Sequence, residues 1–315
     1  MPLDGLLLID KPPGITSFDV VRRMRRALKV KKVGHLGTLD PFATGLLPLA
    51  LGEATKLAQF LLEEPKTYRA ILKLGVETDT QDLTGRVVRE SGILPQPEAI
   101  HQAVGKFRGE IDQVPPKFSA VRHLGTRLYK LARRGEAVEA PPRKVVIYRL
   151  EVEDITLPRV TILVECSKGT YVRTLAHDLG RALGCGAHLT SLTRLAVGPF
   201  RLEEAIILEE LEEPENAALI RQRLIPLADC LPGLPAVHVD RLQARRLAQG
   251  QTLPWPEAVP PLGAKVRVLT EGELVAVAAV CAQGARRVLA PRRVFHQTYL
   301  SRERPGHRAG PAALG

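Results

Sequence analysis

One stretch of this sequence decides its fold: Gly34-His35-Leu36-Gly37-Thr38-Leu39-Asp40-Pro41-Phe42-Ala43-Thr44-Gly45-Leu46-Leu47-Pro48. Its glycines and prolines predict a loop that interrupts periodic structure. On its own, Asp40 before a proline is an ordinary turn residue. Its apolar neighbours change that interpretation, because a carboxylate among Leu39, Phe42 and Leu46 either finds a cationic partner or becomes protonated. We expect the partner to be Arg173, at the junction of a strand and a helix.

The segment before this loop predicts a strand, a turn and a basic helix. The apolar run over 6–9 ends at a turn over 11–14, and Thr16 and Ser17 supply the oxygens of a helix N-cap. The helix expected over 18–32 has a basic face. Its positive charges would repel one another unless an anion binds there. Two interpretations stay open for this face: simple solvation, or contact with nucleic-acid phosphates by Arg22, Arg26 and Lys32.

Hydrophobic periodicity predicts most of the remaining elements. The polar residues over 76–87 are expected to form a loop, and a linker is expected near 231–235. The helices are expected over 53–62, 97–107, 171–183 and 240–249, and the strands over 67–74, 145–157, 160–166, 265–269, 274–280 and 286–294.

Composition and charge limit the class of protein. The 315 residues predict about two domains, and the formal net charge of +11 indicates nucleic acid as a partner. No apolar run approaches the roughly 18 residues of a membrane span, and the N-terminus lacks a signal-peptide pattern. We therefore expect a soluble, cytoplasmic protein without a membrane partner. The four cysteines are far apart, so neither a metal site nor a disulfide framework is expected.

Several classes of enzyme are excluded by the absence of their motifs. The sequence contains no Gly-x-x-x-x-Gly-Lys-Ser/Thr, Gly-x-Gly-x-x-Gly, His-Glu-x-x-His or Gly-x-Ser-x-Gly pattern. Chemistry driven by a nucleotide, by hydride transfer or by a metal therefore has no support in the sequence. The loop over 34–48 is the remaining candidate for an active site.

Five motifs, in chain order, resemble the TruB family of tRNA pseudouridine synthases. The loop over 34–48 is similar to the family's catalytic loop, Gly-His-x-Gly-x-Leu-Asp-Pro-x-Ala-Thr-Gly. The other four are Leu8-Ile9-Asp10-Lys11-Pro12-Pro13-Gly14 with Thr16-Ser17, Lys66-Thr67-Tyr68-Arg69-Ala70, Ser167-Lys168-Gly169-Thr170-Tyr171-Val172-Arg173, and Gly186-Ala187-His188-Leu189-x-x-Leu192-x-Arg194-Leu195. The match extends over about residues 5–200, and residues 235–300 resemble a PUA domain, a small RNA-binding β-barrel.

The resemblance implies an α+β protein with the pseudouridine-synthase fold, a mixed and mostly antiparallel sheet flanked by helices. A small, C-terminal, β-barrel-like PUA domain would follow this fold. The catalytic domain is then expected over 1–230, with an insertion over 95–145 that grips tRNA and carries a basic segment, 117–134. The PUA-like domain is expected over 235–300 and a disordered tail over 301–315.

The resemblance also implies a reaction, in which uracil detaches at N1, rotates and reattaches through C5 without a cofactor. Asp40 falls on the catalytic aspartate of the family. Three roles stay open for its carboxylate: attack on C1′ of the ribose, attack on C6 of the uracil, or promotion of a glycal by loss of the 2′ proton. Arg173 would keep Asp40 ionised, because a nucleophilic carboxylate has to carry its charge.

Four further residues receive roles by the same resemblance. Tyr68 would lie against the flipped uracil, with its hydroxyl placed to move a proton. Tyr171 would form the back of the site, and Leu192 would form an apolar wall of the base pocket. His35 would contact the RNA loop rather than act as an acid or base. For Tyr68 and Leu192 the alternative is ordinary packing in the sheet.

The substrate implied is uridine 55 in the T-loop of tRNA, extruded from the loop before reaction. A monomer that needs no protein partner is expected, with assistance to tRNA folding as a further role. The alternatives are a non-catalytic RNA-binding protein, a relative that depends on guide RNA and partner proteins, and a glycosidase. The glycosidase is disfavoured, because no motif places a second acid beside Asp40.

Overall fold

The structure is a computed structural model that describes residues 3–119, 122–123, 126–127, 140–211, 217–255 and 260–295. The chain divides into two units, of which the larger consists of Leu7–Ala50 and Ala58–Leu224. The smaller consists of Met1–Leu6, Leu51–Leu57 and Ile225–Gly315. The tail over 301–315, for which disorder was expected, and most of the basic segment over 117–134 lie outside the described residues.

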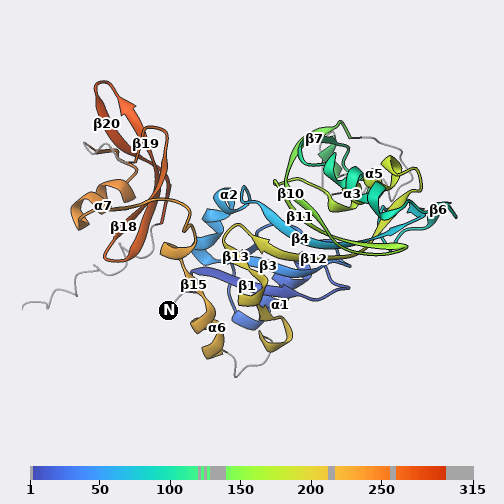
Figure 1. The fold of residues 1–315 in the computed structure, drawn as a ribbon. Coiled ribbons are helices and arrows are strands. Elements are labelled where there is room, and N and C mark those ends of the chain that lie inside the picture. Colours follow the sequence, from blue (N-terminus) through green and yellow to red (C-terminus); the bar gives the residue numbers. More distant parts are fainter. Residues whose placement is uncertain are drawn as a thin grey trace, which may run out of the picture. The chain divides into compact units, whose positions relative to one another are not determined.

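A mixed sheet forms the centre of the larger unit (Figure 1). Its central strands pair antiparallel, whereas β1 pairs parallel with β14 and β3 pairs parallel with β12. This is the mostly antiparallel, mixed sheet that the family resemblance implied. The order across the sheet is β14 (Ile206–Ile207), β1 (Gly5–Lys11), β3 (Thr44–Leu51), β12 (Ala187–Val197), β4 (Lys66–Leu74), β11 (Arg159–Cys166), β10 (Arg143–Thr156) and β7 (Gly109–Gln113).

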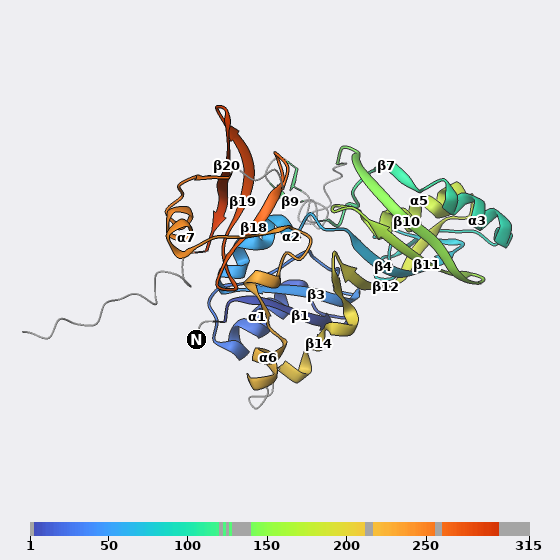
Figure 2. The ribbon, with the colours of Figure 1, turned by 60° about the vertical axis from the view of Figure 1, so that its left-hand side comes forward.

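Helices and short strands complete this unit. In both views α3 and α5 lie beside the part of the sheet that contains β4, β11 and β10, whereas α1 lies beside β1 (Figures 1 and 2). The helices are α1 (Ser17–Leu28), α2 (Ala58–Leu61), α3 (Pro97–Gly105), α5 (Val172–Ala182) and α6 (Ala217–Arg223). The short strands are β2 (Val33–His35), β5 (Val76–Thr78), β6 (Val87–Glu90), β8 (Arg122–His123), β9 (Thr126–Arg127) and β13 (Phe200–Arg201).

Helix α1 begins where the N-cap residues predicted it. The Thr16 hydroxyl accepts a hydrogen bond from the backbone N–H of Asp19, and the Asp19 carboxylate accepts one from the backbone N–H of Thr16. The expectation of a helix as far as residue 32 was wrong. Lys29 takes a left-handed backbone conformation with φ of 53°, which ends the helix at Leu28.

The structure also corrects the expectation of a loop over 34–48. Strands β2 and β3 enter this stretch from both sides, so that the loop proper spans residues 36–43. Gly45 permits this, because its φ is +97° and an added Cβ would lie 2.4 Å from the carbonyl oxygen of Arg194 on β12. The segment over 76–87 likewise contains strands at both ends, β5 and β6, which pair as a hairpin.

The smaller unit is built on a sheet in the order β16-β18-β19-β20-β17, as expected for a PUA-like domain. Its core consists of buried aliphatic side chains from these strands and from α7. The elements are β15 (Ile225–Pro226), β16 (Ala236–His238), α7 (Arg241–Ala248), β17 (Leu253–Pro254), β18 (Lys265–Thr270), β19 (Glu273–Gln283) and β20 (Arg286–Val294). In the parts of the chain that the structure describes, no helix is long and apolar enough to cross a membrane.

Two helical glycines provide a test of the packing behind α5. A Cβ at Gly180 would lie 2.2 Å from the backbone nitrogen of Ala187, whereas a Cβ at Gly105 in α3 would meet no atom within 4 Å. We expect Gly180→Ala to lower the free energy of unfolding by about 1–3 kcal/mol through overpacking. Gly105→Ala, the control, should leave it unchanged or raise it by up to about 1 kcal/mol. Urea denaturation midpoints would measure both, and equal midpoints would contradict the crowding at Gly180.

Candidate active site

Two cavities, of about 820 and 270 Å³, share Asp40 and Arg173 in their walls. The larger is also lined by His35, and the smaller by the other candidate side chains, Tyr68, Tyr171 and Leu192. The structure therefore brings all six candidate residues of the site together around one carboxylate. The proposed phosphate contacts Arg22, Arg26 and Lys32 line neither cavity.

Backbone anchors fix the loop that carries Asp40. The Ser17 hydroxyl accepts a hydrogen bond from the N–H of Leu39 at 2.8 Å and donates to its carbonyl at 3.2 Å. On the other side of Asp40, the carbonyl of Pro41 accepts bonds from the N–H of Gly14 at 2.8 Å and from Lys11 Nζ at 3.2 Å. The first residue of α1 and the turn before this helix thus hold the two neighbours of Asp40, whose side chain lines both cavities.

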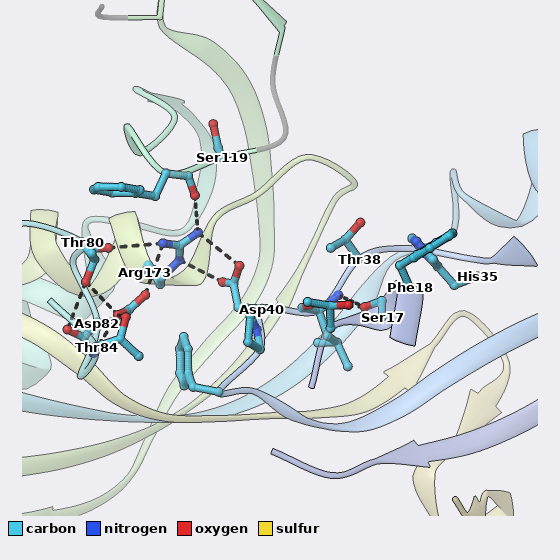
Figure 3. A pocket seen from close by; sticks show the side chains of 15 residues that line it. Ser17, Phe18, His35, Thr38, Asp40, Thr80, Asp82, Thr84, Ser119 and Arg173 are labelled. Atoms are coloured by element: carbon cyan, nitrogen blue, oxygen red, sulfur yellow. Dashed lines mark hydrogen bonds and ion pairs between the residues drawn. The ribbon is translucent and has the colours of Figure 1, made fainter. Parts of the chain in front are cut away.

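The carboxylate of Asp40 contacts the guanidinium of Arg173, the residue expected from the sequence (Figure 3). Nη2 of Arg173 donates to Oδ1 at 3.2 Å, and Nε lies 2.9 Å from Oδ2 as an ion pair without hydrogen-bond alignment. The Arg173 side chain is 4% exposed, whereas the Asp40 side chain is 31% exposed. One partner is therefore fixed in the interior, while the other reaches the cavities.

Arg173 binds a second carboxylate, that of Asp82, on the opposite side of its guanidinium (Figure 3). Nη1 of Arg173 lies 3.2 Å from Oδ2 of Asp82, whose side chain is 5% exposed. The hydroxyls of Thr80 and Thr84 both donate to Oδ1 of Asp82, at 2.7 and 2.6 Å. The carbonyls of Thr80 and Phe118 accept the remaining Arg173 bonds, at 3.2 and 3.1 Å.

Burial raises the pKa of Asp40 above the usual carboxylate value, because removal from water disfavours the charged form. The positive charge of Arg173 lowers this pKa, as does that of Lys11 to a smaller extent. The negative charge of Asp82 raises it. Arg173 is thus the group that most favours the ionised form of Asp40. Its charge offsets part of the rise in pKa that burial causes, but not all of it.

The smaller cavity has an aromatic and apolar wall. Tyr68 on β4 is 9% exposed and Leu192 on β12 is 6% exposed, and both line this cavity together with Tyr171. Burial raises the pKa of the Tyr68 phenol and that of the Tyr171 phenol. The buried amide of Gln113 fixes the backbone of Tyr171, since it accepts from the N–H at 2.7 Å and donates to the carbonyl at 3.0 Å.

His35 lies at the edge of the larger cavity, at the end of β2. Burial lowers the pKa of its imidazole, and the positive charge of Arg194 lowers it further. Its ring is therefore neutral at neutral pH. In the described ranges, no group of three or more His, Cys, Asp or Glu side chains is arranged to hold a metal ion.

Comparison with known proteins decides the family. The model of the TruB family pseudouridylate synthase N-terminal domain matches residues 25–172. The models of the tRNA pseudouridylate synthase B C-terminal domain and of the C-terminal region of pseudouridine synthase II TruB match 173–231 and 235–295. This chain belongs to the TruB family of pseudouridine synthases. It is thus an isomerase, as the five motifs predicted.

Curated relatives match the synthase over most of its length. The tRNA pseudouridine synthase B of Geobacter sulfurreducens is 48% identical over 284 residues, which cover 88% of this chain and 93% of that protein. The tRNA pseudouridine synthase B of Thiobacillus denitrificans is 50% identical over 253 residues, covering 80% of this chain and 84% of that protein.

Solved structures confirm the fold class. An H/ACA ribonucleoprotein bound to a substrate RNA containing 2′-deoxyuridine has a chain with a TM-score of 0.73 and 28% identity, covering 94% of the synthase and 87% of that chain. A chain in a Cbf5–Nop10–Gar1 complex matches with a TM-score of 0.72 and 30% identity, covering 93% of the synthase and 85% of that chain. The pseudouridine-synthase fold and its PUA-like C-terminal unit, both expected from the sequence, are therefore confirmed.

Sequence reasoning missed two residues of this site. Asp82 was interpreted only as part of a polar loop, although Thr80 and Thr84 on either side supply the hydroxyls that hold its carboxylate. Lys11 was recognised as part of a motif but received no role. The hydroxyls around Asp82 are visible in the sequence, but its position opposite Arg173 depends on how the β5–β6 hairpin folds.

The pairing of Asp40 with Arg173 predicts a change in pH dependence. Removing the guanidinium in Arg173→Met should raise the pKa of Asp40 further, and the rising limb of the rate profile should move to higher pH. We expect the single-turnover rate at neutral pH to fall about 100-fold from misplacement of the carboxylate. Rates measured from about pH 5 to 9 would show both effects.

Arg173→Lys is the matched variant for this experiment. Lysine keeps the charge but cannot bind Asp40 and Asp82 through one planar group. Arg173→Lys should therefore retain part of the single-turnover rate, with little shift in the rising limb of the pH–rate profile. Near-ultraviolet circular dichroism would establish that both variants are folded. A wild-type profile in folded Arg173→Met would show that Arg173 does not control the ionisation of Asp40.

Proposed function

We propose that this synthase converts uridine 55 in the T-loop of tRNA to pseudouridine, without a cofactor. The observation that carries the proposal is the position of Asp40, at the junction of two cavities and against a fixed guanidinium. Both curated relatives described above bear the name tRNA pseudouridine synthase B. A T-loop is recognised by its shape and splayed bases, which suits a deep pocket better than a helical groove.

In the proposed reaction, uridine 55 flips out of the loop and its base enters the smaller cavity. Tyr68 and Leu192 then contact the uracil ring, Tyr171 forms the back of the site, and Asp40 faces the ribose and the adjacent edge of the base. The N1–C1′ bond breaks and the C5–C1′ bond forms, while C5 loses a proton and N1 gains one. No atom is gained or lost overall, so no co-reactant is needed.

Asp40 starts this reaction in its ionised form, by one of the three paths left open by the sequence. The ion pair with Arg173 orients the carboxylate oxygens, because the guanidinium itself is fixed by Asp82 and by two backbone carbonyls. Orientation of this kind contributes to rate before any bond changes. His35, with a neutral ring, contacts the RNA loop at the edge of the larger cavity.

Several further assignments complete the proposal. The catalytic domain spans 1–230, with a tRNA-gripping insertion over 95–145, and the PUA-like domain over 235–300 binds RNA. The synthase acts in the cytoplasm as a monomer, without a guide RNA or protein partner. Solved structures of similar fold include a Cbf5–Nop10–Gar1 complex, so activity of the purified chain alone is the discriminating observation.

Assistance to tRNA folding is a second proposed role. It would depend on binding to the RNA rather than on the chemistry at Asp40. A variant without turnover that still accelerates the formation of folded tRNA would separate the two roles.

The proposed function predicts the behaviour of Asp40→Asn, which keeps the shape of the side chain but removes its charge. Purified wild-type synthase should convert position 55 of an unmodified tRNA transcript, detected as a carbodiimide-dependent stop in primer extension. The Asn variant should show no detectable turnover, with tRNA affinity within about tenfold of wild type, or roughly 1.4 kcal/mol. A transcript with cytidine at position 55 is the control, and multiple turnover by the variant would contradict the assignment of Asp40.

We also propose that cations on and after α1, namely Arg22, Arg26 and Lys32, contact RNA phosphates. Arg22 is 73% exposed and pairs with Asp19 at 2.7 Å, an interaction that phosphate can replace. The logarithm of the binding constant should therefore fall linearly with the logarithm of salt concentration. Replacing Arg22 and Arg26 by Gln should flatten this slope by about 0.7–0.9 for each phosphate that no longer meets a cation.

The matched control for the salt experiment removes two exposed cations elsewhere. Arg159 on β11 and Lys73 on β4 lie in register with each other, and neither lines either of the two cavities. Their replacement by Gln changes the net charge by the same amount and should leave the slope near its wild-type value. A slope unchanged from wild type in the Arg22 and Arg26 double variant would assign the α1 face to solvation.

A further inference from the structure

A buried arginine beneath the catalytic loop has no role in the proposed chemistry. Arg194 on β12 is 1% exposed and lines the smaller cavity. Its Nε donates to the carbonyl of Leu46 at 2.7 Å, and its Nη2 donates to the carbonyl of Gly37 at 3.1 Å. These carbonyls lie on opposite arms of the loop, one before and one after Asp40. A single guanidinium therefore ties the two arms together.

The backbone of Arg194 joins the same elements. It lies in register with Gly45 on β3 and with Tyr68 on β4, so this residue connects the end of the loop to the strand of the tyrosine. Residues paired in register present their side chains on the same face of a sheet, which places Arg194 beside Tyr68. Arg194 thus joins the loop of Asp40 to the strand of Tyr68 beside the smaller cavity.

The charge of Arg194 also acts within the cavity. Among the ion pairs of the described residues, none joins Arg194 to a carboxylate. A second buried cation, Lys66, lines the same cavity, and the pKa of Lys66 is lowered to about 8 by burial and by the charge of Arg194. Burial raises the pKa of the Tyr68 phenol, whereas Arg194 lowers it. Arg194 therefore favours negative charge on the oxygen of Tyr68.

We propose that Arg194 is a positioning residue that holds Asp40 and Tyr68 at their working separation and supplies positive charge next to the phenol. The part that concerns Tyr68 rests on the proposed function, in which this tyrosine contacts the flipped uracil. The part that concerns the loop rests on the hydrogen bonds alone. A guanidinium is suited to both, since it donates in several directions within one plane and keeps its charge when buried.

Two substitutions separate geometry from charge. Arg194→Lys keeps the charge but cannot bind both carbonyls in the arginine geometry, whereas Arg194→Met removes charge and donors together. We expect single-turnover rates about tenfold below wild type for the lysine variant and about 100-fold or more below it for the methionine variant. The dissociation constant for the RNA should change by less than about threefold, so that the loss falls on kcat rather than on KM.

A double-mutant cycle with Tyr68→Phe tests whether Arg194 acts through the tyrosine. If it does, the combined loss in rate for Arg194→Lys with Tyr68→Phe should be about tenfold smaller than the product of the single losses. Arg159→Lys, an exposed change on β11, is the control and should be additive with Tyr68→Phe. Additive losses for the Arg194 pair would overturn the role of Arg194 toward Tyr68.

Amide hydrogen exchange tests the loop without relying on the reaction. Arg194→Lys should increase exchange at residues 36–43 while leaving β10 and β11 at wild-type rates. Unchanged exchange in the loop together with a wild-type rate would overturn the proposal. All rates are compared with wild type on an RNA that the wild-type protein converts. If the wild type converts that RNA but not uridine 55 of tRNA, the proposed substrate is wrong and the test of Arg194 still stands.

Discussion

The guanidinium of Arg173 binds the carboxylates of Asp40 and Asp82 at once, and the geometry of the site depends on this arrangement. Asp40 comes from the loop between β2 and β3, Asp82 from the turn between β5 and β6, and Arg173 from α5. Three segments far apart in the sequence therefore meet at one side chain. The Arg173–Asp82 pair is buried on both sides, and removing one partner from such a pair typically costs about 3–5 kcal/mol, so α5 and the β5–β6 turn hold each other in place and orient the loop of Asp40.

Around this centre, side chains hold the backbone of the catalytic loop. Ser17 binds Leu39, Lys11 binds the carbonyl of Pro41, and Arg194 binds carbonyls on both arms. These anchors act on the main chain, so they hold the loop whatever the ionisation state of Asp40. A site fixed in this way does not have to reorganise when charge develops during a reaction, which is the main source of electrostatic catalysis.

The sequence predicted those features that local patterns determine. The N-cap at Thr16, the alternation in β4 and the hairpin between β18 and β19 all follow from residues close together in the chain. The pairing of Asp40 with Arg173 was predictable because an apolar loop required a cation. The role of Asp82 was not, since three neighbouring polar residues in a turn look the same whether or not a buried arginine lies opposite.

The central position of β12 was also beyond local reasoning. Its partners are β3 on one side and β4 on the other, and only the folded sheet shows that its Arg194 reaches both arms of the loop. Likewise, the end of α1 at Leu28 depends on the backbone conformation of Lys29, a residue type with no strong preference for ending a helix. Long-range pairing and single backbone angles account for most of the differences from expectation.

The division of the chain into units has a consequence for how such proteins are cut and recombined. The smaller unit includes Met1–Leu6 and Leu51–Leu57 as well as the C-terminal strands, so the chain passes between the units four times. Within that unit, Asp4 binds the N–H of Glu53, and Lys56 binds the carbonyl of Val294. The C-terminal strands therefore share one compact unit with two short segments from the N-terminal part of the chain. Excision at a single linker would leave two N-terminal segments without the structure that they complete.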